Sequence, residues 1–111
     1  MPYADEAFRR LTIGDAILLA QIVDRRDPDR SAPHLDERTE ALLQLAALIA
    51  LDAPASSFRS AVGAAQRTGV RLEELLATLY AVAGTVGSAR VVSAAPRIAL
   101  AAGYDVEAAL E

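Results

Sequence analysis

The sequence contains no cysteine and no lysine, and it has a single histidine. Without cysteine the chain can form no disulfide, no thiolate nucleophile and no zinc-thiolate site, so thiol redox chemistry is excluded. Without lysine it cannot form the Schiff base of lysine-dependent enzymes. All eleven basic residues are therefore arginines, whose forked donors bind carboxylates well.

Positive charge is also scarce, because 15 acidic residues give the chain a net charge of -4. Nucleic acids and acidic membrane surfaces are bound by clusters of cations. The basic pairs at 9–10 and 25–26 are interleaved with acidic residues. We therefore expect neither a nucleic-acid nor a membrane partner.

Long hydrophobic runs are absent as well. The longest nearly apolar stretch, Ala41 to Leu51, is too short to span a bilayer. The N-terminus lacks the basic region and apolar run of a signal peptide. We expect a cytoplasmic protein.

Apolar residues are nevertheless abundant, at 53% of the 111 residues. A chain of this length fits one domain, and a small domain leaves much of its surface in water. The apolar surplus is more than one such globule can bury. It therefore predicts a homo-oligomer.

The N-terminal third divides into a helical and a charged part. An amphipathic turn is expected around Ala4 to Arg10. An apolar helix over Ile13 to Val23 follows, with Thr12 and Asp15 resembling a capping box, and its apolar pattern predicts that it is largely buried. The segment 24–34 is charged and broken by prolines, which is typical of a solvated loop.

Two helices are predicted next, as an antiparallel pair. Asp36 is a plausible N-cap for an apolar helix over 39–51. Pro54 suits the first turn of a second helix, which runs to about Arg67 before Gly69 supplies a positive φ.

The rest of the chain also reads as helical. A leucine stripe predicts a helix from Leu72 to about Ala83, and Gly84 to Gly87 reads as a turn between helices. The apolar segment Ala89 to Ala101 contains Pro96 and is either kinked or split there. No strand alternation is present, so the expected fold is all-α with six or seven helices.

Three segments stand out by their order and spacing: Leu35 to Glu40, Gly69 to Leu75, and Val86 to Pro96 followed by 103–105. Together they resemble the carboxymuconolactone decarboxylase family, which includes the alkyl hydroperoxidase D-like proteins. The resemblance covers roughly 35–105. It implies an alkyl hydroperoxidase D-like helical bundle that assembles as a trimer or hexamer.

We thus expect one carboxymuconolactone decarboxylase-like domain over 1–111. Its parts are N-terminal helices in 1–23, a charged loop in 24–34 and a family-like core in 35–105. In the oligomer, we expect Ala89 to Ala101 to help bury the interface.

Redox-active relatives carry a Cys-x-x-Cys-x-x-x-His run on the helix before the glycine, and the decarboxylase branch keeps a histidine there. These positions fall on Pro54, Ser57 and Ala61, or one residue earlier on Ala53, Ser56 and Ser60. Neither register supplies a cysteine or a histidine. A further glutamate of redox members falls on Ala41, beside Glu40. The resemblance implies a degenerate active site without thiol peroxidase activity, because serine cannot replace the peroxidatic or the resolving thiol.

The residues around these positions are the best positional candidates for a pocket. They are Ser56, Ser57, Arg59 and Ser60. Arg59 can bind a carboxylate. The alternative is that Ser56 and Ser57 cap a helix while Arg59 pairs with a surface acid.

Other candidates lie outside this segment. His34, the sole histidine, is either a general base brought into a pocket or a solvated loop residue. Tyr80 and Arg90 either line a cavity or serve packing and a surface ion pair. Glu73 and Glu74 point about 100° apart on a helix, so they read as first-turn acids and not as a catalytic pair.

Two functions follow. The first is a cofactor-free lyase or isomerase acting on a small carboxylated molecule. The alternative is a non-catalytic helical oligomer that acts as a binding or assembly module. We expect no cofactor and no metal in either case.

Overall fold

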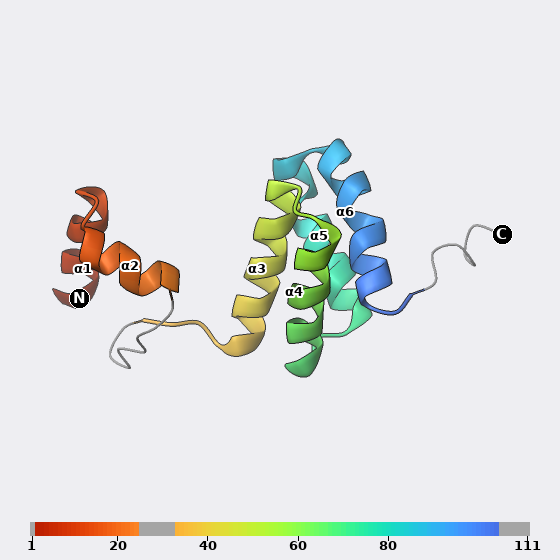
Figure 1. The fold of residues 1–111 in the computed structure, drawn as a ribbon, viewed down its shortest axis with the longest axis horizontal. Coiled ribbons are helices and arrows are strands. Elements are labelled where there is room, and N and C mark those ends of the chain that lie inside the picture. Colours follow the sequence, from red (N-terminus) through yellow and green to blue (C-terminus); the bar gives the residue numbers. More distant parts are fainter. Residues whose placement is uncertain (1, 25–32, 105–111) are drawn as a thin grey trace. The chain divides into compact units, whose positions relative to one another are not determined.

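The computed structural model describes residues 2–24 and 33–104, and in these ranges it contains six α-helices and no strand (Figure 1). This confirms the prediction of an all-α fold with six or seven helices. The chain divides into two compact units, Met1–His34 and Leu35–Glu111. Each unit is described by itself.

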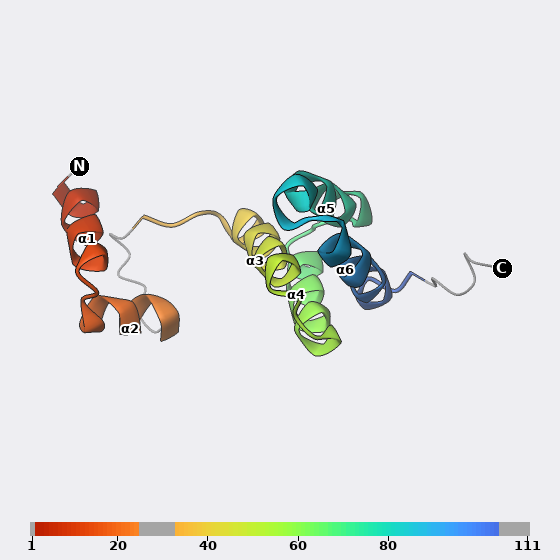
Figure 2. The ribbon, with the colours of Figure 1, turned by 90° about the horizontal axis from the view of Figure 1, so that it is seen from above.

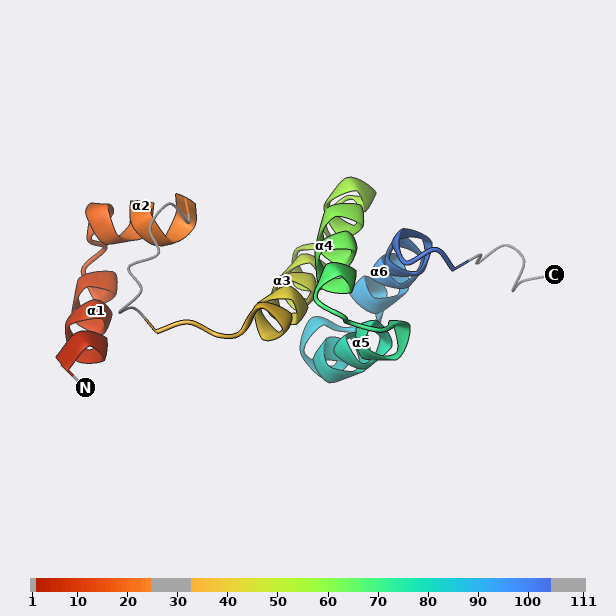
Figure 3. The same ribbon diagram turned by 90° about the horizontal axis from the view of Figure 1, so that it is seen from below.

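The first unit contains α1 (Pro2–Thr12) and α2 (Ala16–Asp24), which meet at a corner (Figure 3). The turn between them passes through Gly14, whose φ of 71° favours glycine. The expected short turn around Ala4 to Arg10 is thus a full helix. The second helix starts three residues later than the expected Ile13.

Asp15 alone caps α2. Its carboxylate accepts hydrogen bonds from the backbone N–H groups of Ile17 and Leu18, both at 3.0 Å. The hydroxyl of Thr12 instead donates to the carbonyl of Phe8, at 2.7 Å. The predicted capping box of Thr12 and Asp15 is therefore wrong, because Thr12 still belongs to α1.

The prediction that the second helix is largely buried is also wrong. Leu18 is its only buried residue, and Ile17 and Val23 are 69% and 75% exposed. Sequence periodicity shows which residues are apolar, but not what packs against them. Within the first unit, α1 is the only other helix among the described residues, and it contacts one side of α2.

The second unit is a bundle of four helices: α3 (Glu37–Leu51), α4 (Ala55–Arg67), α5 (Leu72–Val86) and α6 (Ser88–Ala101). Helix α3 packs against α4 and α5, and α6 packs against the same two helices and against α3. Seen from above, α3 and α4 lie on one side and α5 and α6 on the other (Figure 2). Helices α3 and α4, which the sequence predicts as a pair, do pack against each other.

The predicted N-cap of α3 and the predicted end of α4 agree with the structure, whereas α3 begins two residues before the predicted Thr39 and Pro54 precedes α4 instead of lying in its first turn. The carboxylate of Asp36 accepts a hydrogen bond from the N–H of Thr39 at 2.7 Å, as an N-cap does. Pro54 stands in extended conformation directly before α4. Gly69, with a φ of 87°, follows the end of α4.

The break between α5 and α6 lies later than predicted. Helix α5 continues through Gly84 to Val86, and Gly87, with a φ of 88°, forms the connection. One glycine inside a helix costs only about 1 kcal/mol, which packing of Val86 against the core can offset. Helix α6 is not split, since it runs unbroken through Pro96.

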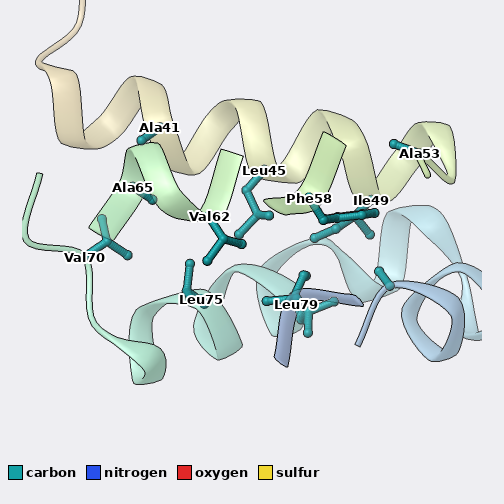
Figure 4. Packing of buried hydrophobic residues seen from close by; sticks show 12 residues of the cluster. Ala41, Leu45, Ile49, Ala53, Phe58, Val62, Ala65, Val70, Leu75 and Leu79 are labelled. Carbon is teal, nitrogen blue, oxygen red and sulfur yellow. The ribbon is translucent and has the colours of Figure 1, made fainter. Parts of the chain in front are cut away.

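The core of the second unit is built from one apolar stripe on each helix (Figure 4). Phe58 and Val62 of α4 are fully buried against Leu45 of α3 and Leu75 of α5. These side chains recur every three or four residues, as expected for the inner face of a helix. The outer face of α4 is therefore free to carry serines.

Candidate functional site

An open hollow of about 580 Å³ lies between α3 and α4. Its lining residues are Gln44, Ala47, Leu48, Ser56, Ser57, Ser60, Ala61 and Ala64. On each of the two helices the lining residues are one, three or four positions apart, so they lie on one face of that helix. The hollow is thus a surface feature of the helix pair that precedes Gly69.

The structure brings together three of the candidate residues, Ser56, Ser57 and Ser60. They lie in the first two turns of α4. Ser56 and Ser60 are exposed and Ser57 is half-buried, so the hydroxyls are accessible from solvent. On the opposite side of the helix, Phe58 is fully buried and fixes the orientation of this serine face.

Both registers of the family motif reach this hollow. Ser57 and Ala61 line it in one register, and Ser56 and Ser60 in the other. The first motif position does not, because Ala53 is buried in the core and Pro54 precedes the helix. The positions that the family resemblance assigns to reactive groups, apart from the first, thus line this hollow.

The chemistry of the hollow is neutral. None of the described residues that line it has an ionisable side chain, and its polar groups are the three serine hydroxyls and the amide of Gln44. These groups donate and accept hydrogen bonds. They supply no general acid or base near neutral pH and no charge that would bind a carboxylate.

Arg59 does not line the hollow, although it lies on the same helix as the serines. It is exposed, and among the described residues its guanidinium forms no hydrogen bond or ion pair. The alternative of a surface ion pair is therefore not observed in the described part of the chain. Arg59 is available to a ligand or partner outside the hollow.

Tyr80 does not line the hollow either, and His34 belongs to the other unit. His34 is exposed and is the last residue of the first unit. Tyr80 is 73% exposed on α5, so it is not a core residue. Arg90 neither lines this hollow nor forms a surface ion pair with a described residue, because its Nε donates to the carbonyl of Ala50 at 2.8 Å.

Glu73 and Glu74 both lie in the first turn of α5 and have different environments. Glu73 is exposed. Glu74 accepts a hydrogen bond from the backbone N–H of Arg71 at 3.2 Å and forms an ion pair with Arg38. These contacts make Glu74 a capping residue that joins two helix starts.

A polar clamp that the sequence did not reveal joins α6 to the turn after α3. The Ser93 hydroxyl donates to the carboxylate of Asp52 at 2.6 Å. Arg97 Nη1 donates to the carbonyl of Ala53 at 2.7 Å and lies 3.4 Å from the Asp52 carboxylate. The sequence signal for this clamp was the four-residue spacing of two polar residues, Ser93 and Arg97, in the otherwise largely apolar helix α6. This clamp holds the turn that leads into the serine face.

Among the described residues, the carboxyl groups of Glu6, Asp15 and Asp36 have lowered pKa values, and none of them lines the hollow. The Arg9 guanidinium lowers the pKa of Glu6. The Arg10 guanidinium, with the backbone N–H of Leu18, lowers the pKa of Asp15 to about 2. The backbone N–H of Thr39 lowers the pKa of Asp36. These shifts arise from helix capping and ion pairing.

The described residues contain no group of three or more histidine, cysteine or acidic side chains that could hold a metal ion. Nor does any helix in the described ranges combine the length and apolarity needed to cross a membrane.

The fold and the hollow define an all-helical bundle in which one accessible face of α4 carries three serines. The family model described as the carboxymuconolactone decarboxylase family matches residues 18–101, more than half of the chain. The chain belongs to the carboxymuconolactone decarboxylase family. The match begins in α2, earlier than the Leu35 at which the motifs start. No curated protein and no solved structure matches the chain.

Proposed function

We propose that this protein is a non-catalytic member of its family, a helical oligomer that acts as a binding or assembly module. The observation that supports this is the neutral lining of the hollow, at the positions that the family resemblance assigns to reactive groups. A hollow that is open to solvent also lacks the exclusion of water on which preorganised catalysis depends.

Thiol peroxidase activity is absent under this proposal. Peroxide reduction needs one thiolate to attack the peroxide oxygen and a second thiol to resolve the sulfenic acid. The chain has no cysteine for either step. The serines at 56, 57 and 60 act through hydrogen bonds only.

The second candidate is a cofactor-free lyase or isomerase acting on a small carboxylated molecule. Arg59 favours it, because this exposed guanidinium has no partner among the described residues and lies beside Ser60 on α4. The candidate requires that Arg59 reach a ligand held in the hollow. It also requires an acid or base that the described lining does not supply.

Further properties stay predictions from the sequence and the family. They are a trimeric or hexameric assembly, a single domain over 1–111 and a cytoplasmic location. The apolar side chains exposed on both units support the assembly. Its interface is expected to include Ala89 to Ala101.

Thermal unfolding in the presence of lactones and dicarboxylates separates the two candidates. We expect no rise in Tm and no turnover for the wild type. Turnover of one of these compounds that Arg59→Gln abolishes, and that Arg67→Gln keeps, would overturn the proposal in favour of the lyase. Arg67 is the matched control, because it is an exposed arginine at the other end of α4.

Sedimentation velocity at micromolar concentration tests the assembly. We expect a mass above that of one 11.7 kDa chain. A monomer at this concentration contradicts the proposal.

A further inference from the structure

Helices α4 and α6, which pack against each other, contain four arginines and no acidic residue. The chain as a whole has a net charge of -4, so this pair of helices is a basic part of an acidic protein. On α6, Arg90 and Arg97 donate hydrogen bonds to the carbonyl groups of Ala50 and Ala53. The two arginines of α4 have no such role within the bundle.

Arg59 and Arg67 are exposed in the second unit, and they form no hydrogen bond or ion pair with any described residue. The positions 59, 63 and 67 recur every four residues and therefore lie on one face of the helix. We name the face formed by Arg59, Gly63 and Arg67 the basic face. Its two arginines are about 12 Å apart along the helix axis, or about two turns.

The basic face is open between its two arginines, because Gly63 has no side chain. Beyond the backbone of the helix itself, the described atom nearest to the place of a Cβ at Gly63 is Nη1 of Arg67, at 3.6 Å. The Arg67 side chain thus extends towards the turn of Gly63, in the direction of Arg59. A second helix can approach the backbone closely at Gly63 while both guanidinium groups reach its side chains.

The spacing of the two arginines indicates the form of the partner. On a second helix, side chains seven or eight positions apart also lie on one face, two turns apart. The forked donors of arginine bind carboxylates in bidentate geometry. A helix with two acidic residues at this spacing therefore meets both arginines at once.

We propose that the basic face binds a helix of another protein that carries acidic residues seven or eight positions apart. This inference rests on the proposed function, for which it names the partner of the binding module. Within each of the six described helices of this chain, the acidic residues are at most three positions apart. No described helix of this chain, in the same or in a second copy, thus meets both arginines.

Other anionic partners fit the basic face less well. Nucleic acids are bound by clusters of cations, whereas this face offers two on a chain of net charge -4. Binding to a membrane surface needs large apolar side chains beside the basic ones, and the three residues of the face include none. A free carboxylate meets a single exposed arginine, and one exposed ion pair contributes little.

The first test uses two alanine-based helical peptides of about 20 residues, a length at which such helices form in water. One carries a glutamate every seven positions along one face. The other carries the same glutamates every five positions, so that they wind around the helix. Fluorescence anisotropy at low ionic strength is expected to show tighter binding of the first peptide to the full chain. Equal binding of both peptides, or binding of neither at millimolar concentration, would overturn the inference.

The second test changes the charge of the basic face. Arg59→Gln and Arg67→Gln are each expected to weaken binding of the first peptide about two- to fivefold, the range of one exposed ion pair. Arg71→Gln is the matched control, because Arg71 is an exposed arginine at the start of α5, outside the basic face. We expect the control to bind as the wild type does. A loss in the control as large as in the other two variants contradicts the proposed surface.

The third test changes the shape of the basic face and keeps its charge. Gly63→Leu is expected to weaken binding of the first peptide, because the new side chain holds the second helix away from α4. The variant is expected to unfold at a Tm no lower than that of the wild type, since leucine favours a helix more than glycine does. Unchanged binding in this folded variant contradicts the close approach at Gly63.

Two further outcomes separate this inference from the proposed function. Sedimentation velocity of Arg59→Glu combined with Arg67→Glu is expected to give the wild-type mass. A lower mass means that a second copy covers the basic face, and it overturns the inference alone. Turnover of a lactone or a dicarboxylate by the wild type overturns the proposed function, whereas the peptides test only the inference.

Discussion

Arg38, in the first turn of α3, forms an ion pair with Glu74, in the first turn of α5. The two residues are 36 positions apart in sequence and belong to two of the segments that resemble the family. Glu74 is mostly buried, with 19% of its side chain exposed, and it also accepts the backbone N–H of Arg71. This carboxylate thus joins two helix starts and caps one of them.

Two replacements of Glu74 are expected to destabilise the bundle to different extents. Glu74→Gln keeps an acceptor for the Arg71 N–H but loses the ion pair, whereas Glu74→Ala loses both. We expect the alanine variant to lower the free energy of unfolding by about 1 kcal/mol or more, and the glutamine variant by less. Urea unfolding measures this. Glu73→Ala, at the exposed neighbour, is the control, and a control loss as large as that of Glu74→Ala contradicts the role of Glu74.

Phe58→Ala is expected to lower the free energy of unfolding by about 3–5 kcal/mol, because the ring is fully buried and leaves a cavity. Tyr80→Ala removes an aromatic ring that is 73% exposed and is expected to cost far less. Chemical denaturation of both variants compares the two losses. Similar losses would be inconsistent with the core described above.

The Asp15 carboxyl is expected to titrate at about 2, below its ordinary 3.8, because Arg10 and the N–H groups of Ile17 and Leu18 favour its charged form. The folded-state pKa is lowered, so the stabilisation is complete above pH 3.8 and is lost as the pH falls towards 2. Carboxyl chemical shifts followed by NMR give this pKa. Arg10→Gln is expected to raise it, and an unchanged value in that variant would contradict the assigned cause.

Arg97→Gln is expected to lower the free energy of unfolding by about 1 kcal/mol, because the side chain donates to the carbonyl of Ala53 across the α3–α4 turn. Arg67→Gln, at an exposed arginine on α4, is the control and is expected to have little effect. Thermal unfolding of both variants distinguishes a clamp from a general effect of charge. Equal shifts in Tm would argue against the clamp.

Much of the helix pattern was predictable from local chemistry. Asp36 and Gly69 mark a helix start and a helix stop because capping and positive φ depend on a few neighbouring atoms. The same reasoning failed at Thr12, because two helices meet there and a cap signal does not tell which of them a residue belongs to. It failed at Gly84 because packing of Val86 extends the helix beyond its local preference.

The candidate site was predictable in part. The helix face that carries Ser56, Ser57 and Ser60 followed from the family motif, and these serines do line one hollow with Gln44. That Arg59 points away from the face of Ser60 could be expected from helix geometry, since neighbouring residues of a helix point about 100° apart. The clamp of Asp52, Ser93 and Arg97 was not predictable, because it joins residues about 40 positions apart.

The sequence by itself determined that the protein is helical, that it carries three motifs resembling those of a known family and that it lacks thiols. These three properties depend only on the composition and on the order of neighbouring residues. Only the tertiary structure decided that the serine face is an open and neutral hollow, and that α2 exposes most of its apolar side chains. Burial depends on which surfaces meet. Sequence periodicity names an apolar face, but the packing of distant segments decides whether that face is covered.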